Sequence, residues 1–394
     1  MTTTIIISFC LLLVIAYVFD LTASRTKVPS VILLLLLGWV VRGLTELIDF
    51  RLPDFSPILP ILGTIGLILI VLEGSLELEL NKSKLGLIRK SFLGALLPMF
   101  AIAFLLAFAF MQFGNFGFKD SLTNSIPFCV ISSAIAIPSV RYLSTNIKEF
   151  VIYESSLSDI LGVLIFNFLA LNSTIDSHSI GQFALQIIIM IIVSFIATIG
   201  LSFLLSKIQH HIKFVPIILL VILIYSVSKI YHLPSLIFIL FFGLSIGNLD
   251  KLKGFEWFAI FKPDELKNEV KKFKELIIEG AFLVRSLFFL LFGFLIETPE
   301  LLNVDTLIWA FGIVFSIFLF RAIQIKLSKL PLQPLLFVAP RGLITILLFL
   351  SIDPNNTISL VNKSLIIQVI IISALLMMAG LIMNKPNKQE AESE

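Results

Sequence analysis

Charged residues are scarce in this chain of 394 residues. Asp, Glu, Lys and Arg make up 14% of the sequence, whereas hydrophobic residues make up 58%, and the mean hydropathy is +1.05. This composition lies outside the range of soluble globular domains. Apolar runs of about 18 residues or more, the length that crosses a bilayer, recur along the chain. The sequence therefore predicts an all-α polytopic membrane protein.

Cysteine and histidine are equally rare. Cys10 and Cys129 both lie in apolar runs, so no disulfide framework is indicated. The four histidines fall in connections, without the spacing of a metal site. The sequence also has no phosphate-binding loop and no soluble catalytic constellation. We therefore expect no enzyme, no cofactor and no nucleic-acid partner.

The apolar runs predict about thirteen transmembrane helices in one integral membrane domain, residues 1–383. The first run has no small-residue cleavage site before it, which favours a retained span over a removed signal peptide. A polar tail, residues 384–394, is predicted to be disordered. The predicted spans are 3–22, 28–48, 57–80, 91–112, 122–144, 150–172, 181–206, 214–232, 234–249, 277–297, 304–326, 332–352 and 362–383.

Lysine and arginine in the connections predict the orientation. With the N-terminus outside, about 22 of these residues fall in inside connections and about 5 in outside ones. The inside set includes Arg321, assigned to the connection after the eleventh span. This asymmetry predicts a cytoplasmic C-terminus. Residues 250–280, which are basic and partly amphipathic, are predicted to form a cytoplasmic surface helix at the lipid headgroups, with a regulatory role as the alternative.

Ionisable residues occur inside several predicted spans. Asp159, Arg285 and Arg341 each lie about nine or ten residues from the cytoplasmic end of a span, close to the middle of the membrane. Glu154 lies about one turn nearer the cytoplasm, and Glu73 lies in the cytoplasmic half of the third span. A charge at the bilayer centre costs about 2.5–3.5 kcal/mol, so such residues pair, face the bundle interior or line an ion route.

Glu154 and Asp159 are predicted to have different roles. They are five residues apart, about 140° around a helix, so they cannot both face one partner. If Glu154 pairs with an arginine, Asp159 is left beside the hydroxyls of Ser155 and Ser156. A carboxylate among hydroxyls is a hard oxygen site that suits Na⁺ or Li⁺ and is also protonatable. The structural alternative for these charges is an ion pair that only locks helices together.

Two predicted spans are interrupted. The fifth contains "VISSAIAIPSVRYLS", with Ser132, Ser133 and Pro138, and the twelfth contains "VAPRGLIT", with Pro340 and Gly342. Proline removes a backbone N–H and glycine permits unwound geometry, and both are tolerated at depth where they line a cavity. The two spans run in opposite directions. Such a pair is typical of inverted repeats with a site at the midplane.

Five segments in this order resemble the monovalent cation:proton antiporter superfamily: "TKVPSVILLLLLGWVV", "GTIGLILIVLEGSLELEL", "ISSAIAIPSV", "ESSLSDILGVLIF" and "APRGLITILLF". The resemblance covers nearly the whole chain. It implies a homodimer of thirteen-helix subunits, whose core domain holds two crossed, unwound helices and moves against the dimerisation domain in alternating access. Here those helices are the fifth and twelfth spans, with the sixth beside them.

The resemblance also implies roles for single residues. Asp159 matches the aspartate that binds ion or proton in turn, and Glu154 matches a glutamate that pairs with a core arginine. Arg341 or Arg285 is the candidate partner, with Arg341 slightly favoured. Ser158 replaces the Asn or Asp that the family carries before its aspartate, and the serine pair of the fifth span is nearer the potassium-efflux branch. These departures leave the ion species open.

The leading hypothesis is electroneutral exchange of Na⁺ or Li⁺ for H⁺ in a bacterial inner membrane. Asp159 and Ser155 would bind the cation, with Ser132, Ser133 and Ser158 beside them. One alternative is K⁺/H⁺ exchange of the potassium-efflux type. Another is a channel-like or non-transporting membrane sensor with the same fold.

Overall fold

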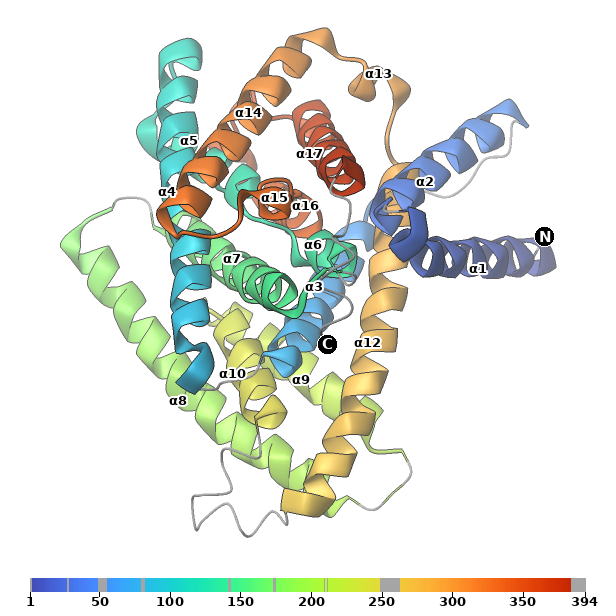
Figure 1. Cartoon of the computed structure of the whole chain (residues 1–394), viewed down its shortest axis with the longest axis vertical. Coiled ribbons are helices and arrows are strands. Elements are labelled where there is room, and N and C mark those ends of the chain that lie inside the picture. The colour runs from blue at the N-terminus through green and yellow to red at the C-terminus, as the bar shows by residue number, and fades with distance from the viewer. Residues whose placement is uncertain are drawn as a thin grey trace. The chain divides into compact units, whose positions relative to one another are not determined.

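The described part of the chain is built of helices and contains no β-strand (Figure 1). The computed structural model describes residues 2–26, 28–48, 55–78, 82–140, 143–172, 175–208, 210, 212–248 and 263–383. In chain order the helices are α1 (Thr2–Thr26), α2 (Ser30–Leu47), α3 (Ile58–Glu77), α4 (Leu85–Gly114), α5 (Phe118–Cys129), α6 (Ser133–Ser139), α7 (Thr145–Leu171), α8 (Ser177–Lys207), α9 (Phe214–Ile230), α10 (Leu236–Gly247), α12 (Pro263–Phe294), α13 (Thr298–Leu301), α14 (Val304–Leu327), α15 (Leu332–Leu335), α16 (Leu343–Leu350) and α17 (Lys363–Met383), with 3-10 turns at Lys82–Lys84 and Pro354–Asn356.

Each predicted span coincides with a helix or with a pair of helices. Among the described residues, nine helical segments have the length and composition to cross a membrane, and three shorter helical stretches are also apolar. The connection 231–234 separates α9 from α10 as predicted, and His232 in it has a φ of 55°. The all-helical membrane fold is therefore confirmed, while the number of spans stays a prediction.

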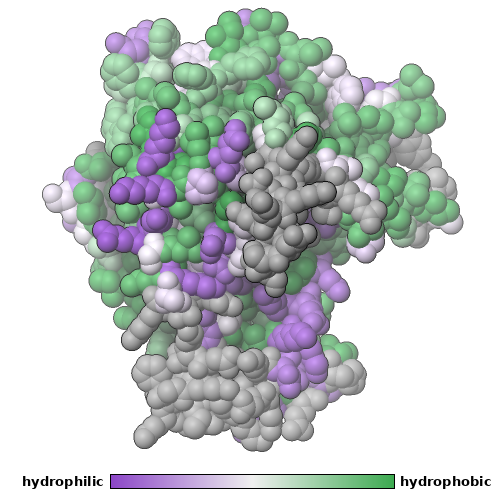
Figure 2. All heavy atoms as spheres, viewed as in Figure 1, coloured by the Kyte–Doolittle hydropathy of each residue, from purple (hydrophilic) through white to green (hydrophobic). Residues whose placement is uncertain are grey.

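Hydrophobic side chains cover much of the surface that Figure 2 presents. In α8 the exposed ones include Ile180, Leu185, Ile188, Ile192 and Ile196. A helix that is apolar around its whole circumference belongs in a protein core or in lipid. Because the lipid interior offers backbone groups no hydrogen-bond partner, each segment satisfies its own by forming a helix.

The chain divides into two compact units. The first comprises Met1–Thr64, Leu87–Gly162 and Leu283–Glu394, and the second comprises Ile65–Gly86 and Val163–Phe282. In the first unit, α1 packs on α2, α14 on α17, and α5 on α16. In the second unit, α8 packs on α10 and on α9. The interrupted segments and the buried charges near them all belong to the first unit.

The predicted surface helix is not a separate element at residues 263–276, and its location at the lipid headgroups stays a prediction. These residues form the first part of α12, which runs on to Phe294, because no proline interrupts the helix after Pro263. Two ion pairs hold this part within the second unit, Lys213–Glu269 at 2.6 Å and Lys274–Glu77 at 3.8 Å. Residues 249–262, where the rest of the predicted helix falls, and the predicted tail 384–394 lie outside the described residues.

Helices α2 and α12 approach each other closely at two glycines in the first unit. A Cβ at Gly38 would lie 2.7 Å from the Phe294 backbone nitrogen, and one at Gly293 would lie 2.9 Å from the Leu35 Cα. Small residues permit this kind of backbone approach between membrane helices. Because the opposing atoms are backbone, they cannot move aside as a side chain can.

We therefore predict that Gly293→Ala destabilises the protein by about 1–3 kcal/mol through overpacking. Gly43→Ala on α2 is the matched control, because a Cβ there meets nothing within 4 Å. The control is expected to keep or slightly raise stability, since alanine is the better helix former by up to about 1 kcal/mol. Thermal unfolding of the purified protein in detergent compares the two, and equal melting temperatures would contradict the close approach.

Candidate functional site

The two predicted interruptions are present and lie side by side. Residues 130–132 separate α5 from α6, and residues 338–342 precede α16. The Ser132 N–H donates to the Pro340 carbonyl at 2.9 Å, which joins the two unwound segments. Both segments are buried. Non-helical backbone is tolerated at membrane depth when it is enclosed by protein in this way. That the two helices cross there stays a prediction.

Helix α7 supports the first interruption at three successive points. The Ile131 N–H donates to Ser158 Oγ at 2.9 Å, and the Ser133 hydroxyl donates to Asp159 Oδ2. A Cβ on Gly162 would collide with the Val130 side chain, so helix and unwound segment are in close contact there. Helix α7 thus provides hydrogen bonds and contacts in place of those that residues 130–133 would have made within a continuous helix.

Asp159 is buried, with 1% of its surface exposed. Its Oδ1 atom has no hydrogen-bond partner in the described part of the chain, and the same is true of the neighbouring Ser132 Oγ. Buried polar atoms are nearly always satisfied, so two unpartnered oxygens next to an unwound backbone make this place the candidate functional site. The chemistry on offer is one carboxylate and several hydroxyl oxygens.

The predicted serines differ in what their hydroxyls do. Ser155, four residues before Asp159 and about 40° from it around the helix, donates its proton to the Val151 carbonyl at 2.7 Å. Its oxygen lone pairs therefore stay available. The Ser158 hydroxyl accepts a hydrogen bond from the Ile131 N–H, so it supports the unwound backbone of the first interruption. The Ser156 hydroxyl is buried and has no partner among the described residues. Around the helix, Ser156 lies about 60° from Asp159, on the opposite side from Ser155 and Glu154.

Glu154 forms a buried bidentate ion pair with Arg321. Arg321 Nη1 lies 3.0 Å from Glu154 Oε1 and Nη2 lies 2.8 Å from Oε2, with at most 2% of either side chain exposed. Arg321 Nε also donates to the Leu335 carbonyl at 2.7 Å. The predicted partners, Arg341 and Arg285, are therefore wrong for this structure, because Arg321 near the end of α14 faces the protein interior instead of the cytoplasmic connection.

The sequence carried a signal for Arg321 that the span prediction missed. On α14 the buried residues recur at helical spacing, at Ala310, Ile313, Ile317, Arg321 and Gln324. Arg321 thus continues the apolar stripe that faces the protein interior. Its position near the C-terminal end of the span made it look like a cytoplasmic connection residue.

Arg341 holds the two interruptions together by hydrogen bonds to carbonyls. Its Nε donates to the Phe128 carbonyl at 2.6 Å and its Nη1 to the Ala339 carbonyl at 3.0 Å. Its own N–H donates to Ser373 Oγ on α17 at 3.1 Å. Phe128 lies at the C-terminal end of α5, where a positive charge is favourable because the helix dipole is negative there.

Of the other two predicted charges, Arg285 does not join this group. Arg285 on α12 is 5% exposed, and within the described residues the structure gives it neither a hydrogen bond nor an ion pair. Glu73 on α3 is half-buried and belongs to the second unit.

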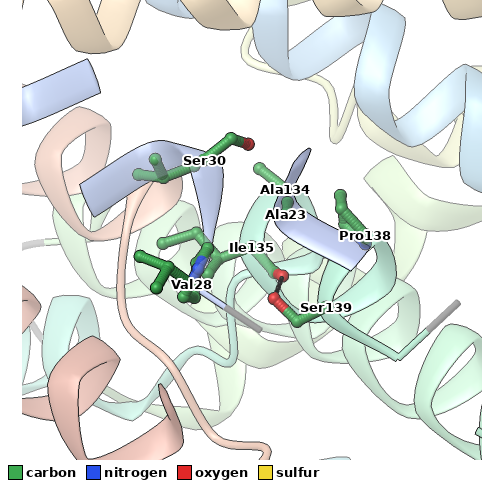
Figure 3. A pocket seen from close by; sticks show the side chains of 9 residues that line it. Ala23, Val28, Ser30, Ala134, Ile135, Pro138 and Ser139 are labelled. Atoms are coloured by element: carbon green, nitrogen blue, oxygen red, sulfur yellow. Dashed lines mark hydrogen bonds between the residues drawn. The ribbon is translucent and has the colours of Figure 1, made fainter. Parts of the chain in front are cut away.

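A small cavity of about 10 Å³ lies beside α6 (Figure 3). Ala134, Ile135, Pro138 and Ser139 line it from α6, and the end of α1 and the start of α2 line it from the other side. The Ser139 hydroxyl is turned back onto the Ile135 carbonyl at 2.7 Å. The space is about that of one water molecule. Because α6 starts at Ser133, the cavity adjoins the helix that carries the Asp159 partner.

Comparisons with known proteins agree with this architecture. The profile of the family described as "Sodium/hydrogen exchanger, transmembrane" matches residues 10–383. Two structures of the sodium proton antiporter MjNhaP1 from Methanocaldococcus jannaschii are similar in fold. One, determined at pH 8, has a TM-score of 0.67 at 20% identity and covers 97% of this chain and 96% of its own. The other, from electron microscopy, has a TM-score of 0.69 at 18% identity and covers 97% and 95%. A search of curated proteins finds no match.

The ion pair predicts a large stability effect for its arginine. Arg321→Ala leaves the Glu154 carboxylate buried without its partner, which costs about 3–5 kcal/mol. Lys326→Ala, near the exposed end of the same helix, is the control and is expected to change stability little. The yield of folded protein and its melting temperature measure both. If Arg321→Ala unfolds like the control, the buried pair is not what holds α7 to α14.

Proposed function

The chain belongs to the transmembrane sodium/hydrogen exchanger family, and we propose that it exchanges Na⁺ or Li⁺ for H⁺ by alternating access. It is an integral membrane protein of a family of cation/proton transporters rather than enzymes. The observation that carries the proposal is the buried Asp159 carboxylate, which has one oxygen bonded to Ser133 and the other unpartnered in the described part of the chain.

The donor set suits a small hard cation. Na⁺ and Li⁺ prefer oxygen ligands, and Asp159, Ser132 and Ser155 offer a carboxylate and two hydroxyl oxygens with free lone pairs. A carboxylate is also a group that can bind a proton. Asp159 can therefore hold either a cation or a proton, and the two compete for it. Ser133 and Ser158 orient the site through their bonds to Asp159 and Ile131.

The distribution of charge favours electroneutral exchange. Arg321 already neutralises Glu154, and the Arg341 guanidinium is bonded to carbonyls. Among these charged residues, Asp159 is therefore the carboxylate that exchanges a proton for a cation. If one carboxylate carries a proton in one direction and a monovalent cation in the other, each cycle moves no net charge.

Alternating access requires a site that faces one side at a time. The unwound segments beside Asp159 support this proposal, because transporters with inverted repeats bind their ions at such interruptions near the midplane. The family resemblance adds a homodimer whose core moves against its dimerisation helices. The proposed location is a bacterial inner membrane. The distribution of Lys and Arg supports an orientation with the N-terminus outside and the C-terminus in the cytoplasm.

The serine pair of the first interruption favours K⁺/H⁺ exchange as the second candidate. Ser132 and Ser133 contribute two neutral hydroxyls to the site. A second carboxylate in their place would bind a small cation more strongly. A site with fewer charged ligands suits a larger cation, which loses less hydration energy on binding. The cation that the protein accepts decides between the two functions.

We predict that Asp159→Asn folds normally and abolishes exchange, because Asn is isosteric but can neither bind a proton nor balance a cation. Asp305→Asn, the same change at an exposed position on α14, is expected to keep full exchange. Dequenching of a pH dye in proteoliposomes with an imposed proton gradient, on addition of Na⁺, Li⁺ or K⁺, measures both. If none of the three cations collapses the gradient with the unmodified protein, the proposed function is wrong.

Electroneutrality predicts that a Na⁺ gradient across a voltage-clamped planar bilayer containing the protein drives no sustained current, while the dye assay in the same lipid reports exchange. A sustained current that Asp159→Asn removes would point to unequal stoichiometry. A current that survives Asp159→Asn would instead favour a channel-like function.

A further inference from the structure

Helix α4 reaches the buried ion pair at Gly94. A Cβ built on this glycine would lie 2.8 Å from Glu154 Oε1 and 2.8 Å from the Gln324 Nε2 atom. Real Cβ atoms essentially never come that close to other heavy atoms. The backbone of α4 therefore lies against the carboxylate itself, at a point where α4, α7 and α14 meet within the first unit.

The contact between α4 and α7 has a defined register. One turn before Gly94, the Ser91 hydroxyl donates to the Phe150 carbonyl at 3.3 Å, and Phe150 lies one turn before Glu154. Ser91 is fully buried. Two successive contacts, Ser91 with Phe150 and Gly94 with Glu154, thus set how α4 packs on α7.

The two neighbours of Gly94 differ in how easily they can move. Gln324 has one weak bond, to Ser328 Oγ at 3.2 Å, and its Oε1 atom is unpartnered among the described residues, so its amide can turn away. Glu154 is bonded by both carboxylate oxygens to Arg321, and Arg321 is in turn bonded to Leu335. A methyl group at position 94 would therefore act mainly by pushing Glu154 out of its bidentate geometry.

We infer that Gly94 is a positioning residue for the Glu154–Arg321 pair, and through that pair for Asp159 one and a half turns along α7. The lack of a side chain at this position lets the backbone of α4 pack directly against the Glu154 carboxylate. The consequence for transport rests on the proposed exchange function, whereas the consequence for the ion pair does not.

The test compares Gly94→Ala with Gly312→Ala in the full-length protein. Gly312 lies inside α14 in the same unit, and a Cβ there meets nothing within 4 Å, so it receives the same methyl group without a collision. Gly94→Ala is expected to lower the melting temperature by several degrees and the exchange rate of the folded fraction by about tenfold or more. Gly312→Ala is expected to keep both.

The pH profile separates positioning from a purely structural role. In folded Gly94→Ala protein, a displaced Glu154 would alter the electrostatic field at Asp159, five residues along the same helix, so the pH of half-maximal exchange is expected to shift. A lower melting temperature with an unshifted profile would overturn the positioning role. Wild-type protein that shows no exchange at all would contradict the proposed function instead, and the melting temperatures would still decide whether Gly94 supports the pair.

A double variant keeps the inference testable if Gly94→Ala fails to fold. Glu154→Asp shortens the side chain by one methylene and so makes room for the added methyl. Gly94→Ala with Glu154→Asp is expected to give more folded protein than the product of the two single effects. Additive losses, or no recovery of folded protein, would show that the methyl group at position 94 does not act through Glu154.

Discussion

The structure depends on satisfying backbone hydrogen bonds where two membrane helices stop being helical. Lipid supplies no partner for an N–H or carbonyl group, so each freed group has to be bonded by protein. Here the Ile131 N–H goes to a serine hydroxyl of α7, the Ser132 N–H goes to the Pro340 carbonyl, and the Phe128 carbonyl accepts from Arg341. These bonds join α5, α7 and the segment before α16 around one point, and Asp159 lies at that point.

Of the buried charged groups near the interruptions, Asp159 differs from Glu154 and Arg341 in its hydrogen bonding. Glu154 is held by both oxygens and Arg341 is bonded to carbonyls, so neither is available to a passing ion. Asp159 retains an oxygen without a partner among the described residues. Two carboxylates on one helix thus have opposite chemistry, because they face different neighbours about 140° apart.

Close contacts at the glycine Cα explain why several glycines stand inside helices where alanine would be the better helix former. Gly94 lies against the ion pair, Gly162 against the first interruption, and Gly293 against α2. In lipid there is little hydrophobic drive between helices, so van der Waals contact and polar bonds carry more of the association. Close approach at glycine makes both possible at the same place.

The sequence by itself determined the helical membrane fold, the break between two helices near residues 231–234, the two interruptions, and the different directions that Glu154 and Asp159 face. These follow from hydropathy, helix period and the chemistry of proline, which act over a few turns of one helix. Only the tertiary structure decided that Arg321 pairs with Glu154, that Arg341 bonds to carbonyls, and that residues 263–276 continue α12. A buried charge takes whichever partner the packing brings near it, and residues 154 and 321 meet through the arrangement of α4, α7 and α14, which no local pattern encodes.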